Sequence, residues 1–285
     1  MRKFAAIIKF ELLRYFMSPV AYVYLLTFLF LNASFTLYLG YFLERGQAVL
    51  SLMFGYQPWI YLIFISGIAM RLWAEEFKTQ TVTQILSLPV SVAQLVWGKF
   101  AAAWIFCSFA LALTFPFAVT ANVLGQPDNG IITASYLGSF LLAGAMLATA
   151  QTMSSLTKSQ VIALVLAVIV NLLFFLSGLE YVLRFFRSFL PDALVENIAY
   201  LSFLSHYGDL CGGVIGLRDI VFFASVIILF NFMTEVLVRG KTSGIAPIIG
   251  RGNKFGYAWL IISAWLIFAG FNLTINAIFA GQRID

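Results

Sequence analysis

Charged side chains that could bind a partner gather in one interval of this chain, residues 71–99, which reads RLWAEEFKTQTVTQILSLPVSVAQLVWGK. The charged residues of the interval are Arg71, Glu75, Glu76, Lys78 and Lys99. Uncharged apolar runs flank it at 46–70 and 100–127. The interval is therefore predicted to face water between two membrane spans.

The sequence lacks the residues that a phosphate-binding loop or a metal site requires. Gly240–Thr242 reads GKT like the end of a phosphate-binding loop, but that motif needs a glycine at the position held by Glu235. Cys107 and Cys211 are far apart, and with the one histidine, His206, they provide no metal cluster. A structural role is the main hypothesis for His206, and a proton relay the alternative. A chain of this kind is passive or takes its energy from a partner.

Composition places the chain in a membrane. Its 285 residues are 62% hydrophobic and 10% charged, with a mean hydropathy of +0.96, whereas about a quarter of the residues of soluble domains are charged. A bilayer core about 30 Å thick needs roughly 20 apolar residues per helix. Continuous apolar runs also disfavour a β-barrel, whose strands alternate. The predicted fold is an all-α polytopic membrane protein. Its predicted spans are residues 18–42, 53–72, 97–122, 131–155, 160–182, 217–238 and 255–281.

The distribution of charge predicts the orientation. With a cytoplasmic N-terminus and seven spans, 12 of the 17 Lys and Arg residues fall inside. The five outside are Arg45, Arg184, Arg187, Arg218 and Arg283. This bias follows the positive-inside rule. The net charge of +5 is thus explained by topology, and no nucleic-acid partner is expected.

The N-terminal segment, residues 2–16, has Phe4, Ile7, Ile8 and Leu12 near one helical face. That pattern is typical of a helix lying in the cytoplasmic interface of the membrane. The alternative is a frayed leader into the first span.

The outer region, about 183–216, mixes short apolar pieces with scattered charges. We expect short re-entrant helices that dip into the outer leaflet while protein covers their backbone. Glu180 and Arg184 are spaced as an i, i+4 pair. An ion pair at membrane depth is a candidate for function, and a structural pair at the outer boundary is the alternative.

Prolines and small residues carry packing signals. Pro58 is expected to kink its span or mark its first turn, and Pro116 to bend the next span. Small side chains in the fourth span predict a packing face, with a substrate path as the alternative. They are Ala134, Gly138, Ser139, Ala143, Gly144, Ala145 and Ala148.

The polar interval itself predicts an amphipathic helix over residues 73–87. Val82, Ile85 and Leu86 form an apolar face at i, i+3 and i+4, and Pro89 ends the helix. The periodicity leaves two interpretations open: a helix lying on the membrane without a partner, or one that docks into a groove of another protein.

A family resemblance favours docking. Residues 68–100 resemble the segment between the second and third spans of ABC-2 type permeases, the membrane subunits of a class of ABC transporters. Gln80 departs from the usual glycine, and Thr83 from the usual acid. Residues 205–220 resemble the family's lead into its last span. The matching residues are Arg71, Glu75, Glu76, Thr81, Leu86, Leu88, Pro89, Val90, Ser91, Gly98 and Lys99.

The resemblance implies a six-span permease domain over 1–238 and a bacterial inner-membrane location. It implies a dimer with a second permease copy or a homologous permease, and a coupling helix that docks on a cytoplasmic ABC ATP-binding subunit. That partner would bind ATP and Mg, while this chain binds no cofactor and is not itself an enzyme. The residues implied in docking are Arg71, Glu75, Glu76, Lys78, Thr81, Val82, Ile85, Leu86 and Pro89.

The C-terminal part extends beyond the usual six spans. A cytoplasmic linker is predicted over 239–254 and an extra anchor over 255–285, with the C-terminus outside. The anchor resembles that of gliding-motility-type systems, where it leads into a periplasmic domain of a partner or a fused chain. The expected function is export powered by the ATP-binding subunit. The alternative is a mechanotransmission platform that drives a periplasmic assembly and translocates nothing.

Overall fold

The computed structural model describes residues 2–39, 50–86, 90–242, 263 and 265–275. Every regular element among these residues is a helix, and none of them forms a β-strand. Five of the described helices are long and apolar enough to cross a membrane, or up to six if one bent pair counts as a span. The predicted class, an all-α polytopic membrane protein, is confirmed at that level.

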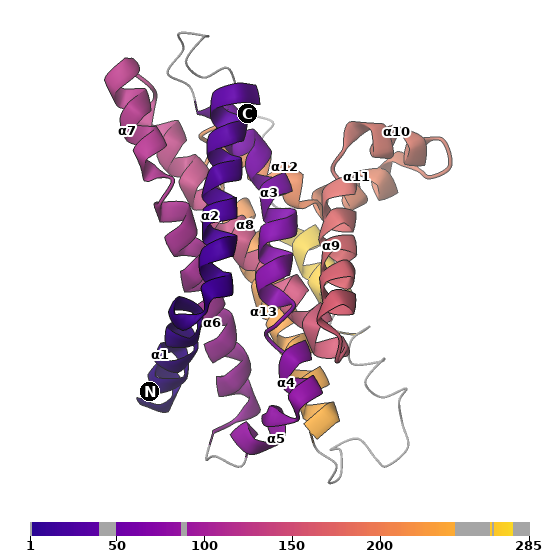
Figure 1. The fold of residues 1–285 in the computed structure, drawn as a ribbon. Coiled ribbons are helices and arrows are strands. Elements are labelled where there is room, and N and C mark those ends of the chain that lie inside the picture. Colours follow the sequence, from indigo (N-terminus) through magenta and orange to yellow (C-terminus); the bar gives the residue numbers. More distant parts are fainter. Residues whose placement is uncertain (1, 40–49, 87–89, 243–262, 264, 276–285) are drawn as a thin grey trace.

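The helices follow one another closely along the chain (Figure 1). They are α1 (Arg2–Met17), α2 (Pro19–Ser34), the π-helical turn η1 (Phe35–Leu39), α3 (Ser51–Ala69), α4 (Ala74–Thr79), α5 (Thr81–Leu86), α6 (Val92–Ala112), α7 (Phe115–Leu124), α8 (Asn129–Leu156), α9 (Gln160–Leu176), α10 (Glu180–Arg187), α11 (Asp192–Tyr200), α12 (Phe203–Cys211) and α13 (Leu217–Thr242).

Helix α8 is the centre of the bundle. It contacts α3, α6, α9, α12 and α13. The small residues of this span are all buried, so the predicted packing face is confirmed. A Cβ atom on Gly144 would lie 2.8 Å from the ring of Trp104 and 2.9 Å from Ile227. Only a residue without a side chain lets α6 and α13 approach α8 this closely.

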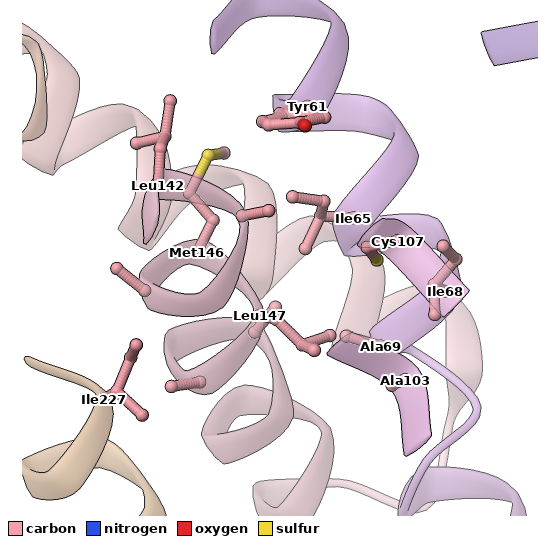
Figure 2. Close-up of a cluster of buried hydrophobic side chains, with 14 of the residues drawn as sticks. Tyr61, Ile65, Ile68, Ala69, Ala103, Cys107, Leu142, Met146, Leu147 and Ile227 are labelled. Carbon is pink, nitrogen blue, oxygen red and sulfur yellow. The ribbon is translucent and has the colours of Figure 1, made fainter. Parts of the chain in front are cut away.

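The core around α8 is apolar and draws on four helices. Figure 2 shows Tyr61 and Ile65 of α3, Cys107 of α6, Met146 of α8 and Ile227 of α13 converging on one volume. Lipid tails are as apolar as these side chains, so close packing rather than exclusion of water holds membrane helices together. The many alanines beside them bring the helix backbones close enough for that packing.

Pro58 lies inside α3 and leaves a backbone acceptor without its usual donor. Proline has no N–H, so the carbonyl of Phe54, four residues earlier, lacks its helical partner. The hydroxyl of Tyr207 in α12 donates to that oxygen at 2.8 Å and lies 3.1 Å from the hydroxyl of Ser139 in α8. The proline thus fixes α12 against α3 and α8.

The third predicted span is broken near Pro116, as expected. Helix α6 ends at Ala112, and α7 begins at Phe115 with Pro116 in its first turn. The Thr114 hydroxyl donates to the carbonyl of Leu111 at 2.6 Å within the break. The span starts earlier than predicted because Ser91 and Gln94 form a reciprocal capping box ahead of Val92.

The seventh predicted span lies mostly outside the described residues. Its described part includes the apolar helix Trp265–Ile275. The Trp265 ring stacks on Phe174 of α9 with centroids 6.0 Å apart, and Asn272 donates to Ser225 of α13 at 3.1 Å. This segment is therefore packed on α9 and α13.

The outer region differs in part from the prediction. Helix α10 bends 72° away from α9 and has no buried residue, so the expected cover of protein over this helix is wrong. Its outward aromatic residues, Tyr181 and Phe185, are exposed. Helix α12 does pack into the bundle, against α3, α8, α9 and α13.

Two groups of described helices lie at opposite ends of the bundle. Figure 1 shows α1, α4 and α5 at the lower end and α10, α11 and α12 at the upper end. Helices α4 and α5 of the polar interval therefore lie at the opposite end from α10, α11 and α12, as the alternating spans require.

Candidate functional site

The polar interval forms two short helices at the lower end of the bundle. Helices α4 and α5 are separated by Gln80, whose φ of +59° lies in the left-handed region. The single helix predicted over 73–87 is therefore wrong, because a left-handed residue ends the run of helical hydrogen bonds. Glycine, the residue usual here in ABC-2 permeases, adopts this conformation without strain.

Replacing Gln80 with glycine is expected to stabilise the protein by up to about 1 kcal/mol, because a left-handed conformation is costly for residues that carry a Cβ. The matched control is Gln84→Gly within α5, which is expected to cost about 1 kcal/mol. Thermal unfolding in detergent measures both. A destabilising Gln80→Gly would contradict the strain assigned to this residue.

The inner face of α4 carries a buried charge cluster made of Glu11, Arg14, Glu76 and Lys99. Lys99 donates to Glu76 and, at 2.9 Å, to Glu11 of α1. Arg14 lies 3.4 Å from Glu76 and 3.8 Å from Glu11. The side chains of Lys99, Glu76 and Glu11 are 1%, 2% and 7% exposed. Two acids and two bases balance, so the cluster carries no net charge.

This cluster joins three helices that are distant in sequence. Glu11 and Arg14 come from α1, Glu76 from α4 and Lys99 from α6. Removing one member of a buried ion pair is strongly destabilising, because the other charge stays buried without compensation. The carboxylate of Glu76 was predicted to contact a partner protein, but it is buried and paired with Lys99 and Arg14 of the same chain.

The start of α4 is held by a side chain of the central helix. The hydroxyl of Ser154 in α8 accepts from the backbone N–H groups of Trp73 and Ala74, both at 3.2 Å, and donates to the carbonyl of Met70. The first N–H groups of a helix have no partner within it. Ser154 therefore caps α4 from another helix and fastens it to α8.

The end of α13 also contacts α4. Lys241 donates to the carbonyl of Ser155 at 2.6 Å, and its amine lies 4.7 Å from the centroid of the Phe77 ring. A cation over an aromatic face is attracted to the ring. Within α8 and α13, Thr152 and Thr234 are hydrogen-bonded at 2.9 Å, so these two helices are also joined directly.

The other predicted docking residues divide between the interior and the surface. Lys78 is exposed, together with its neighbours Thr79 and Gln80. Val82 is buried, and Ile85 packs against the core. Thr81 is half-buried, and its hydroxyl lies 3.1 Å from that of Thr79. Arg71 and Glu75 line a cavity beside α1 and α2. The side chain of Leu86 and the whole of Pro89 lie outside the described residues. An edge formed by residues 78–80 is thus exposed to a partner, and Gln84 of α5 is exposed as well.

Glu180 and Arg184 form the predicted i, i+4 pair on α10. Arg184 donates to Glu180 at 2.5 Å and 3.2 Å. Both side chains are largely exposed, at 73% and 66%. Exposed pairs of this kind contribute little to stability, and this one lies at the end of the bundle opposite α4.

His206 belongs to α12, at the upper end of the bundle in Figure 1. It is buried between α12 and α13, and its Nε2 donates to the carbonyl of Tyr200 at 2.8 Å. Its Nδ1 lies 2.7 Å from Oδ1 of Asp219 in α13, so this hydrogen bond joins α12 to α13. Arg218 lies 3.6 Å from Asp219. Burial raises the pKa of Tyr200, so that phenol stays protonated.

Sequence reasoning did not find Glu11, Arg14 and Ser154. Glu11 had a signal, because it is the only acid before Glu44 and lies in a basic, apolar helix. Ser154 had no such signal, because the backbone groups that its hydroxyl binds depend on which helix packs beside it in the folded chain. No group of His, Cys, Asp and Glu suited to a metal occurs in the part of the chain that the structure describes.

The arrangement defines a class of membrane protein: a helical bundle whose lower end presents a short polar helix braced by several spans. Comparison with known families agrees. The family described as ABC-2 family transporter protein matches residues 7–174, which is more than half of the chain. The chain belongs to the ABC-2 transporter family, whose members are the membrane permease subunits of ABC transporters. No match was found among curated proteins.

Proposed function

We propose that this chain is the membrane subunit of an ABC transporter in which α4 and α5 receive the motion of a separate ATP-binding subunit. One observation carries the proposal. Helix α4 is braced on its inner side by α1, α6, α8 and α13, while its edge at Lys78 is exposed. A helix held in this way transmits a displacement of its exposed edge to the rest of the bundle.

The contacts of α4 indicate which helices such a displacement would reach. A displacement of α4 acts on α6 and α1 through Glu76 and on α8 through the Ser154 cap. Of these helices, α6 and α8 contribute to the apolar core. ATP and Mg enter through the partner, and two permease chains together form the complex. The conformational change opens a path for export, or does work on an attached assembly.

The location follows from the same arrangement. With α4 and α5 meeting a cytoplasmic ATP-binding subunit, α1 and the lower end face the cytoplasm, and α10 to α12 face outward. This is the orientation that the charge bias favours. For a bacterial chain the membrane is the inner one.

Reversing the charge at Lys78 tests the docking edge. Lys78→Glu is expected to reduce co-purification of the ATP-binding subunit about tenfold, since a like-charge contact at an interface costs on the order of 1 kcal/mol or more. The matched control is Lys158→Glu, an exposed lysine in the connection between α8 and α9. Unchanged co-purification of the Lys78 variant, with the complex intact, would contradict docking at this edge.

A second function is favoured by the C-terminal segment. Helix α13 contacts α4 through Lys241 at its lower end and holds the helix Trp265–Ile275 on its side. It can therefore carry motion from α4 to whatever follows that helix. In this function the complex drives a periplasmic subunit or fused domain, as in gliding-motility-type systems. ATP-dependent flux of a cargo through the reconstituted complex would argue against it.

A further inference from the structure

A cavity of about 180 Å³ lies at the elbow where α1 passes into α2. Residues of α1, α2, α3, α4 and α6 line it, together with Ser18 of the elbow and Arg71 and Leu72 of the turn before α4. It has room for on the order of ten water molecules. It is smaller than a typical drug-sized pocket, so it suits a ligand group of a few polar atoms.

Two of the charged groups that line this cavity are unpaired within the described residues. Nothing in that part of the chain accepts a hydrogen bond from Arg71, and its Nε is buried without a partner. The carboxylate of Glu75 likewise has no partner there, and these two do not pair with each other. Glu11 and Lys99 line the same cavity but neutralise one another. The cavity therefore offers one unpaired cation and one unpaired anion.

Buried polar groups are normally hydrogen-bonded, and an exception such as the Nε of Arg71 indicates an absent partner. A partner for this cavity needs an anionic group for Arg71 and a cationic donor for Glu75. Arg binds phosphate through two parallel N–H groups. A primary ammonium has three N–H donors for a carboxylate.

The position of the cavity identifies the source of such a ligand. The exposed face of α1 is apolar at Phe10, Leu13 and Met17, and α2 begins a membrane span at Pro19. Amphipathic helices with this pattern lie at the boundary between headgroups and acyl chains. The elbow therefore lies at headgroup depth, and Val20 and Tyr24 of α2 give the cavity an apolar side.

We propose that this cavity binds the headgroup of a zwitterionic phospholipid with a primary amine, with its phosphate on Arg71 and its ammonium on Glu75. A choline headgroup has no N–H to donate to Glu75. An anionic phosphatidylglycerol has no cation for Glu75 at all. The proposal depends on insertion of the bundle in a membrane and not on docking of an ATP-binding subunit, so either can fail alone.

Lipid retention by the purified full chain tests the proposal. The delipidated protein in detergent is given equal amounts of phosphatidylethanolamine, phosphatidylcholine and phosphatidylglycerol, and native mass spectrometry measures the bound lipid. The expected preference for phosphatidylethanolamine is about tenfold, which corresponds to about 1.4 kcal/mol. Arg71→Gln is expected to lose retention of all three. Glu75→Gln is expected to lose only the preference over the other two.

Two further variants separate binding from folding. Arg71→Lys keeps the charge but loses the two parallel N–H groups, and it is expected to keep only part of the retention that Arg71→Gln loses. Lys158→Gln, which changes an exposed lysine in the connection between α8 and α9, is expected to behave as the wild type. Melting temperatures identify any variant that fails to fold.

Equal retention of the three lipids by the wild type, or unchanged retention by a folded Arg71→Gln, would overturn the proposal. Soluble glycerophosphoethanolamine supplies the last comparison. If it raises the melting temperature as much as the lipid does, the cavity takes a soluble zwitterion and the assignment to a membrane lipid is wrong.

Discussion

Replacing Lys99 with methionine is expected to lower the free energy of unfolding by about 3–5 kcal/mol, because it leaves Glu11 and Glu76 buried next to each other without their shared cation. Arg14 remains 3.4 Å from Glu76 and 3.8 Å from Glu11, but its side chain is 48% exposed, so water screens its charge and it offsets only part of the loss. Denaturant unfolding in detergent micelles, followed by tryptophan fluorescence, measures the change.

Two controls accompany the Lys99 variant. Arg184→Gln breaks the exposed pair on α10 and is expected to leave the unfolding midpoint unchanged. A triple variant with methionine at Glu11, Glu76 and Lys99 removes every unpaired charge created by the single change. It is expected to recover most of the lost stability, because apolar residues of similar volume often replace a buried ion pair at little cost.

The result also bears on coupling. In the triple variant α4 keeps its cap from Ser154 but loses its ionic contact with α6 and α1. The partner's ATP hydrolysis is expected to continue while transport or mechanical output falls. A triple variant with full output would show that the charge cluster serves stability alone. A Lys99→Met protein as stable as the wild type would contradict the buried cluster itself.

Ser154→Ala is the second substitution with a large expected effect. It removes the hydroxyl that accepts hydrogen bonds from the N–H groups of Trp73 and Ala74, in a place where both residues are fully buried. Each N–H left buried without an acceptor costs about 1–3 kcal/mol. Loss of the cap is also expected to loosen α4 from α8.

Hydrogen exchange at Trp73 and Ala74 measures this loosening directly. Both amides are expected to exchange faster in Ser154→Ala, while amides in the middle of α8 keep their protection. The matched control is Ser159→Ala, because Ser159 precedes α9 but its side chain makes no cap hydrogen bond. Ser154→Thr keeps the hydroxyl and tests whether added volume alone disturbs the contact. Unchanged exchange in Ser154→Ala would contradict the cap.

Most of the long helices could be predicted, because a membrane-spanning helix requires a long apolar run in the sequence. Helices α3, α6, α8 and α13 lie where those runs predicted them. The break at Pro116 was predictable from the missing N–H of proline. The single helix predicted over 73–87 was wrong. The apolar periodicity continues through Gln80, but the left-handed backbone conformation of Gln80 ends the helical hydrogen bonding there.

The roles of individual charges were less predictable. Glu75 and Glu76 are adjacent in sequence and look alike, yet Glu76 is 2% exposed and paired with Lys99, whereas Glu75 lines a cavity without a partner. Neighbours on a helix point about 100° apart, so the position of α1 and α6 decides which acid is buried. Glu11 and Lys99 are 88 residues apart, and no local pattern relates them.

The sequence by itself determined that this chain is a helical membrane protein, where most of its spans lie and which interval between them is polar. Those properties depend on composition and on periods of a few residues, which the chain carries locally. Only the tertiary structure decided that α8 is the centre, that Ser154 caps α4 and that Glu76 faces inward. Burial and pairing depend on which distant helices meet, and that is set by close packing around small residues such as Gly144.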